Sequence, residues 1–203
     1  MRRTSLAAGV ATLLLSWVLS ALGLGMVGHM AGHMIAVAVS APLLAWGLGG
    51  TRFDLARIAP QLLHPLAMSV VELGVVWGWH LPALRALADT NPLWLALEQA
   101  SFLAAGVLLW AAVLGAGGER RMRGIGALLL TSMHMTLLGA LIGLAPRPLY
   151  PMMAMHGAMA GLDPLEDQQL GGVVMLLIGG ASYFLGALAL LGGLVRQREE
   201  ARA

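Results

Sequence analysis

Segment 4–51, TSLAAGVATLLLSWVLSALGLGMVGHMAGHMIAVAVSAPLLAWGLGGT, contains no charged residue and decides the fold class. A transmembrane helix needs about 20 predominantly apolar residues, so this segment is long enough for two spans. We expect them at 5–23 and 27–48, separated by a glycine-containing turn. Open strands are excluded because lipid does not tolerate unpaired backbone groups, and the period-two alternation of a β-barrel is absent. The sequence predicts an all-α integral membrane protein.

Four further apolar segments follow, and Pro65 and Pro82 mark the ends of the first of them. We expect these spans at 62–80, 92–114, 124–145 and 171–195. With the first two they predict one transmembrane domain, residues 1–203, built as a bundle of about six helices.

The amino-acid composition excludes several classes of function. A charged fraction of 11% and a mean hydropathy of +0.81 are far from a soluble domain, in which about 25% of residues are charged. The basic residues are all Arg and too scattered for a nucleic-acid surface, which excludes that partner. The absence of Cys excludes thiolate metal sites and thiol nucleophiles. The sequence contains neither a Ser/His/Asp grouping that suggests a nucleophile nor a glycine-rich loop that could bind phosphate, so neither motif indicates an enzyme.

Arginine placement predicts the orientation, because cytoplasmic loops of membrane proteins are enriched in basic residues. If both termini are cytoplasmic, only Arg85 and Arg147 of the 12 arginines lie in outer segments. This asymmetry predicts a multi-pass protein with both termini in the cytoplasm. The Met-Arg-Arg start also suits a signal peptide, but a small-x-small cleavage site is missing. If a signal peptide were cleaved, five spans with an external N-terminus would remain, and the orientations of the later spans would be unchanged.

The polar residues of the spans gather in the outer half of this topology. His29 and His33 are one helical turn apart on one face. At 1.5 Å per residue, His33 and Glu98 lie roughly 10 Å deep, Glu72 about 12 Å and His134 about 15 Å. Ionisable groups in lipid cost at least about 2–3 kcal/mol unless they face the bundle interior. We therefore expect these side chains to converge in one polar pocket.

Methionines interleave with the histidines of the second span, in the order Met30, His33, Met34 after His29. Imidazole and thioether ligands together suit Cu(I), whereas zinc does not use thioethers. The alternative is that the methionines fill space in apolar helices and that Glu72 and Glu98 only hold helices together.

Several stretches resemble the multi-spanning CtaG-type cytochrome c oxidase assembly factors, over most of residues 26–195. They are HMAGHM at 29–34, the run from WHLP at 79–82 to LEQASF at 97–102, MHMT at 133–136, PLYP at 148–151 and LEDQQLGG at 165–172. The resemblance implies help in maturing a haem-copper oxidase by supporting copper delivery to its membrane-embedded subunit. The positions that match the family's pattern are His29, His33, His80, Glu98, His134 and Asp167.

One departure from the family is Gln99, which stands where members often carry a His after the Glu. His156, in the last external loop, could replace the lost ligand. The resulting candidate copper ligands are His29, His33, His80, His134, Met30 and Met34. The candidates for supporting or gating roles are Glu72, Glu98, Asp167 and His156.

The leading hypothesis is a non-enzymatic assembly factor that holds Cu(I) in the outer half of the bacterial inner membrane. Its expected partners are a haem-copper oxidase subunit and the surrounding membrane lipid. One alternative is a b-type haem oxidoreductase, with His29 or His33 and His80 or His134 as axial ligands. Another is a small ion or proton carrier that uses Glu72, Glu98 and His134 as relay groups.

Overall fold

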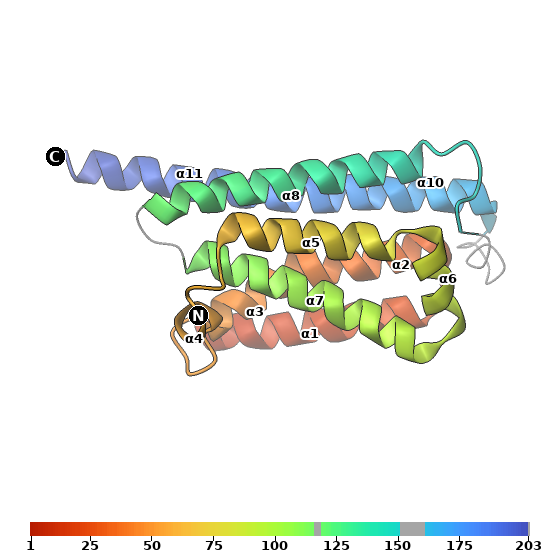
Figure 1. Ribbon diagram of the computed structural model, residues 1–203, viewed down its shortest axis with the longest axis horizontal. Helices are drawn as coiled ribbons and strands as arrows, with labels where there is room; N and C mark the ends of the chain where they lie inside the picture. The colour runs from red at the N-terminus through yellow and green to blue at the C-terminus, as the bar shows by residue number, and fades with distance from the viewer. Residues whose placement is uncertain (116–118, 151–160, 203) are drawn as a thin grey trace.

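The computed structural model of the protein describes residues 1–115, 119–150 and 161–202, apart from the side chain of Glu119, and they contain helices and no strand (Figure 1). The helices are α1 (Arg2–Ala21), α2 (Gly25–Met34), η1 (Ile35–Ser40), α3 (Ala41–Leu48), α4 (Leu55–Ile58), α5 (Pro65–Trp79), α6 (Pro82–Thr90), α7 (Pro92–Leu114), α8 (Glu119–Gly143), α10 (Pro164–Val174), η3 (Met175–Gly179) and α11 (Gly180–Glu200).

Five of the helical segments are long and apolar enough to cross a membrane, which confirms the prediction of an all-helical fold with several candidate membrane spans. Two of them are composite: α2, η1 and α3 form one helix of 24 residues, and α10, η3 and α11 form one of 37 residues. A sixth span is reached if α5 and α6, which meet at a bend of 70°, are counted together.

The segment 81–91, which was expected to be an outer segment between two spans, forms the short helix α6. Leu81 is extended and Pro82 occupies the first turn, where its missing N–H costs no hydrogen bond. Helix α6 packs against α7 and buries Arg85 and Ala88. An amphipathic helix thus covers one end of the bundle and carries a charged residue inside.

The last helix begins at Pro164, earlier than the expected 171, because Asp163 forms a capping box. Its carboxylate accepts hydrogen bonds from the backbone N–H groups of Leu165 and Glu166. The Glu166 side chain in turn accepts one from the Asp163 N–H.

The two termini lie at the same end of the bundle as α4, and α6 lies at the opposite end (Figure 1). Helices α8 and α11 pack side by side, while α5 contacts both α7 and α8. Helix α2 is held between α1 and α10. The end with α6 therefore brings together α2, α6, α7 and the start of α10.

Two π-helical segments, η1 and η3, interrupt the composite spans and contact each other. Polar side chains of α8 and α11 bond the backbone carbonyls at or beside these segments. The hydroxyl of Ser182 donates to the Ala38 carbonyl at 2.9 Å, and that of Ser132 to the Gly180 carbonyl at 2.8 Å. These bonds give backbone carbonyls at or beside the irregular segments a partner on a neighbouring helix, as the lack of water in lipid requires.

Candidate metal centre

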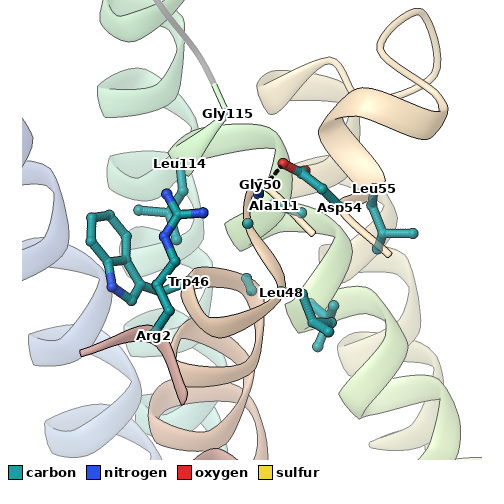
Figure 2. Close-up of a pocket in the computed structure, with 12 residues that line it drawn as sticks. Arg2, Trp46, Leu48, Gly50, Asp54, Leu55, Ala111, Leu114 and Gly115 are labelled. Carbon is teal, nitrogen blue, oxygen red and sulfur yellow. Dashed lines mark hydrogen bonds between the residues drawn. The ribbon is translucent and has the colours of Figure 1, made fainter. Parts of the chain in front are cut away.

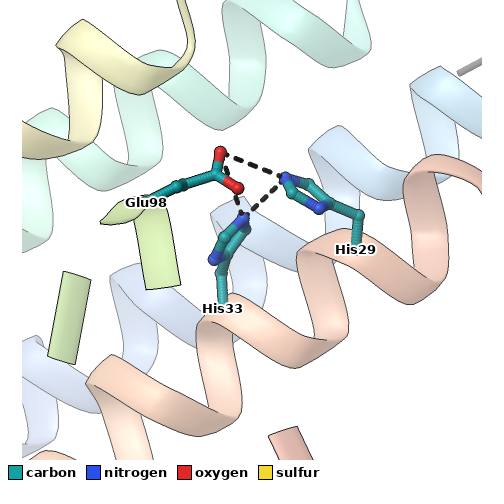
Figure 3. Close-up of side chains that lie close together, drawn as sticks. All are labelled: His29, His33 and Glu98. Atoms are coloured by element: carbon teal, nitrogen blue, oxygen red, sulfur yellow. Dashed lines mark hydrogen bonds and ion pairs between the residues drawn. The ribbon is translucent and has the colours of Figure 1, made fainter. Parts of the chain in front are cut away.

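His29 and His33 on α2 point toward Glu98 on α7 (Figure 3). The two Nε2 atoms are 2.6 Å apart. Glu98 Oε1 lies 3.8 Å from Nε2 of His29 and 4.0 Å from that of His33. The three residues are 5%, 1% and 1% exposed, so they form a buried group of potential ligands.

The position of α2 is fixed by Asp167 of α10. Its carboxylate accepts hydrogen bonds from the backbone N–H of Met26 at 2.6 Å and of Val27 at 3.3 Å. A carboxylate suits the first turn of a helix, where N–H groups lack partners and the helix dipole is positive. Asp167 thus anchors the turn that precedes His29, without joining the group of potential ligands.

Arg85 of α6 reaches the same site. Its Nη1 donates to Glu98 Oε1 and, at 2.9 Å, to Nε2 of His29. Its Nε and Nη2 donate to Oδ1 of Asp89, one turn further along α6, at 3.1 and 2.7 Å. The guanidinium is therefore shared between Asp89 on its own helix and the potential ligands on α2 and α7.

His80 borders the site at the end of α5. Its ring centroid is 6.2 Å from that of His33, and the Phe102 ring packs near both. Nδ1 of His80 is 2.6 Å from the Val76 carbonyl, and its backbone carbonyl accepts from the Tyr150 hydroxyl at 2.9 Å. Burial raises the pKa of Tyr150 to about 12, so this hydroxyl keeps its proton. Nε2 of His80 has no hydrogen-bond partner among the described residues.

Two imidazoles and a carboxylate are a common set of metal ligands. Metal–nitrogen bonds of about 2.0 Å in tetrahedral geometry would separate the two Nε2 atoms by about 3.3 Å. The observed 2.6 Å would have to widen by several tenths of an ångström, which small rotations of the rings can supply. The residues fit a metal ion, provided that Arg85 gives up its bonds to them.

A pocket of about 220 Å³ leads to the group, and His29, Arg85 and Asp89 form its polar wall. Ser20, Leu24 and Leu95 lie on its other sides. His29 is thus in contact with both the pocket and the buried His33. An ion could reach the potential ligands through this opening beside α6.

Residues 1–197 match the family model of the cytochrome c oxidase caa3 assembly factor. The chain belongs to this family. No curated protein and no solved structure matches the chain.

In this protein Met34, which was expected beside the histidines, faces η3 instead. The sulfur of Met34 lies 3.1 Å from the position that a Cβ on Gly179 of η3 would take. Met30 is fully buried in the apolar core. The structure thus surrounds the imidazoles with Glu98 and Arg85, and Met34 packs against η3.

The remaining sequence candidates are distributed away from the group. Glu72 on α5 accepts a hydrogen bond from the Tyr183 hydroxyl of α11. His134 on α8 is buried, and its ring nitrogens have no partner among the residues described. His156 lies outside the described residues. Of the four residues expected in one layer, only His33 and Glu98 belong to the buried group.

Sequence reasoning missed Arg85 and Asp89, which it assigned to an outer loop. Two signals were available. Arg85 departs from the predominance of arginine on the inner side, and its spacing from Asp89 is that of an ion pair on one helix face.

A second pocket, of about 110 Å³, lies at the other end of the bundle (Figure 2). The Arg2 guanidinium is 5.8 Å from the centre of the Trp46 ring on its wall. The Asp54 carboxylate accepts from the N–H of Gly50 at 2.6 Å and of Ala56 at 3.0 Å. Because these bonds close a turn and cap α4, the pocket has no free carboxylate to offer a metal, and we do not assign a function to it.

Proposed function

We propose that this protein assists the assembly of a haem-copper cytochrome c oxidase by holding a copper ion between His29, His33 and Glu98. The observation that carries the proposal is the convergence of two imidazole Nε2 atoms and one carboxylate in a buried group beside a pocket. Membership of the caa3 oxidase assembly factor family supports the oxidase as the partner. The protein acts as a carrier, and its copper is cargo.

The donor set suits a carrier. Both Cu(I) and Cu(II) can take a fourth ligand, so three protein ligands leave a position for a ligand of the accepting protein. Two nitrogen ligands and one oxygen ligand can bind either Cu(I) or Cu(II), whereas the His/Met set expected from the sequence would favour Cu(I). The binding experiment therefore includes both ions.

The proposed orientation places the α6 end at the outer face of the bacterial inner membrane. It is supported by the arginines, most of which lie in segments assigned to the end that carries the termini. Copper would then enter and leave from the outer side.

The test is copper binding by detergent-purified protein, with Cu(I) under anaerobic conditions against a chromophoric chelator, and with Cu(II) in parallel. We expect about one bound copper in the wild type and a loss of binding in the double variant His29→Ala/His33→Ala. The matched control is His64→Ala, which removes a histidine next to α5 at the other end of the bundle. Wild-type affinity in the double variant would refute the ligand assignment. A visible spectrum of the same samples tests the haem alternative.

A further inference from the structure

The Arg85 guanidinium occupies the bonding positions that a metal ion would need. Arginine only donates hydrogen bonds, so Nε2 of His29 must be the acceptor of the 2.9 Å bond from Nη1. A neutral imidazole has one such acceptor nitrogen with one lone pair. The same lone pair would have to coordinate a metal. His29 therefore cannot bind Arg85 and a metal ion at the same time.

Glu98 is subject to the same competition. The same Nη1 donates to its Oε1, which is also the oxygen that lies closest to both imidazoles. The guanidinium carries a positive charge, so it would also repel a cation held within a few ångströms in a buried site. One side chain thus opposes metal binding at two of the three ligands.

Asp89 offers the guanidinium another position. It already binds Nε and Nη2 of Arg85, and its Oδ2 has no partner among the described residues. Asp89 and Arg85 both line the 220 Å³ pocket. Nη1 can therefore leave Glu98 and His29 if the whole Arg85 side chain moves toward the pocket, where Asp89 remains available as a partner of the guanidinium.

We propose that Arg85 and the metal ion are alternating occupants of this site. Arg85 binds Glu98 and His29 in the empty protein, moves toward Asp89 when copper enters, and favours release when it returns. This inference rests on the proposed copper function. It adds a device that limits the affinity of a buried site, as a carrier that must deliver its cargo requires.

Two substitutions are expected to change copper affinity in opposite directions. Arg85→Met removes the competing donors and should tighten binding by at least about fivefold, the lower range of typical coupling between sites. Asp89→Asn leaves all three ligands in place but weakens the alternative position of Arg85, so it should lower the affinity. A purely structural Arg85 would give weaker binding in both variants.

The measurement is competition with the chromophoric chelator in full-length detergent-solubilised protein, with thermal unfolding of each sample as the folding check. Because Arg85→Met leaves Asp89 and Glu98 unpaired, Arg85→Met/Asp89→Asn provides a variant with balanced charge and should also bind more tightly than the wild type. Equal or weaker binding in both folded Arg85 variants, lost on adding His29→Ala/His33→Ala, would overturn the exchange and leave the copper site standing. No copper binding in the wild type or in either Arg85 variant would refute both.

Discussion

Two buried polar clusters occupy different places in the bundle and are built differently. One of them, named the metal cluster after the ion that we propose it holds, lies at the α6 end, borders a pocket and consists of His29, His33, Arg85 and Glu98. The helix-packing cluster, Ser69, Glu72, Thr131 and Tyr183, joins α5, α8 and α11. None of the residues of the second cluster lines the 220 Å³ pocket beside α6 or the 110 Å³ pocket at the other end of the bundle.

Their hydrogen bonds explain the difference. In the helix-packing cluster, Ser69 and Thr131 bond each other at 2.8 Å, and Ser69 also donates to the Ala127 carbonyl. The Tyr183 ring stacks on Trp110 and its hydroxyl reaches Glu72. Hydroxyl groups thus surround one carboxyl and fill the space between helices. The metal cluster instead brings cationic and anionic groups together beside an opening, and this arrangement suits the entry and release of an ion.

The largest expected effect comes from Glu98→Ala. This change removes a proposed metal ligand and one of the two carboxylates that Arg85 binds. Because Asp89 still pairs with the guanidinium, we expect a cost near the lower end of the range of about 3–5 kcal/mol that is typical of a broken buried ion pair. The expected result is a fall in the melting temperature together with loss of copper binding. Retained copper affinity in the folded fraction would remove Glu98 from the site.

Tyr183→Phe tests whether the two clusters act independently. It deletes the hydroxyl that donates to Glu72, and an unsatisfied buried acceptor costs about 1–3 kcal/mol. The expected result is a lower melting temperature with unchanged copper affinity, measured on the same preparation. A parallel loss of copper binding would show that the clusters act as one site.

Asp167→Ala tests how far the metal cluster depends on the start of α2. Loss of a carboxylate that caps a helix costs about 0.5–2 kcal/mol. Because Asp167 bonds the N–H groups just before His29, we expect a modest loss of stability and weaker copper binding. Asp167→Asn, which keeps an acceptor oxygen, should fall between this variant and the wild type. Unchanged copper affinity in Asp167→Ala would show that the cap serves stability alone.

The smallest effect is expected for Tyr150→Phe, which removes the hydrogen bond to the His80 carbonyl. Such a bond contributes about 0.5–1.5 kcal/mol. Because burial raises the pKa of Tyr150 from 10.0 to about 12, its contribution is present below pH 10 and is lost as the pH rises toward 12. The difference in unfolding free energy between the two proteins should therefore be constant from pH 7 to about 9.5. A difference that falls within this range would contradict the assignment.

The spans could be predicted because lipid imposes a strict requirement on composition, and the expected 92–114 coincides with α7. The spacing of His29 and His33 placed them on one face, and counting residues placed Glu98 at a similar depth. The sequence does not determine the rotation of each helix about its own axis, so it could not decide whether Met34 or Glu98 faces the imidazoles. The role of Arg85 was also hidden, because its burial depends on contacts of α6 with distant residues.

The π-helical segment η1 has a consequence for the angle at which the imidazoles face α7. An α-helix advances about 100° per residue, so the extra residue of a π turn rotates everything on one side of it by roughly that angle relative to the other. Helix α3 packs on α1 and α7, while α2, before η1, carries His29 and His33. The π-helical turn that directly follows α2 therefore sets the rotational phase of both imidazoles, and a uniform α-helix with the same α3 packing would turn them away from Glu98.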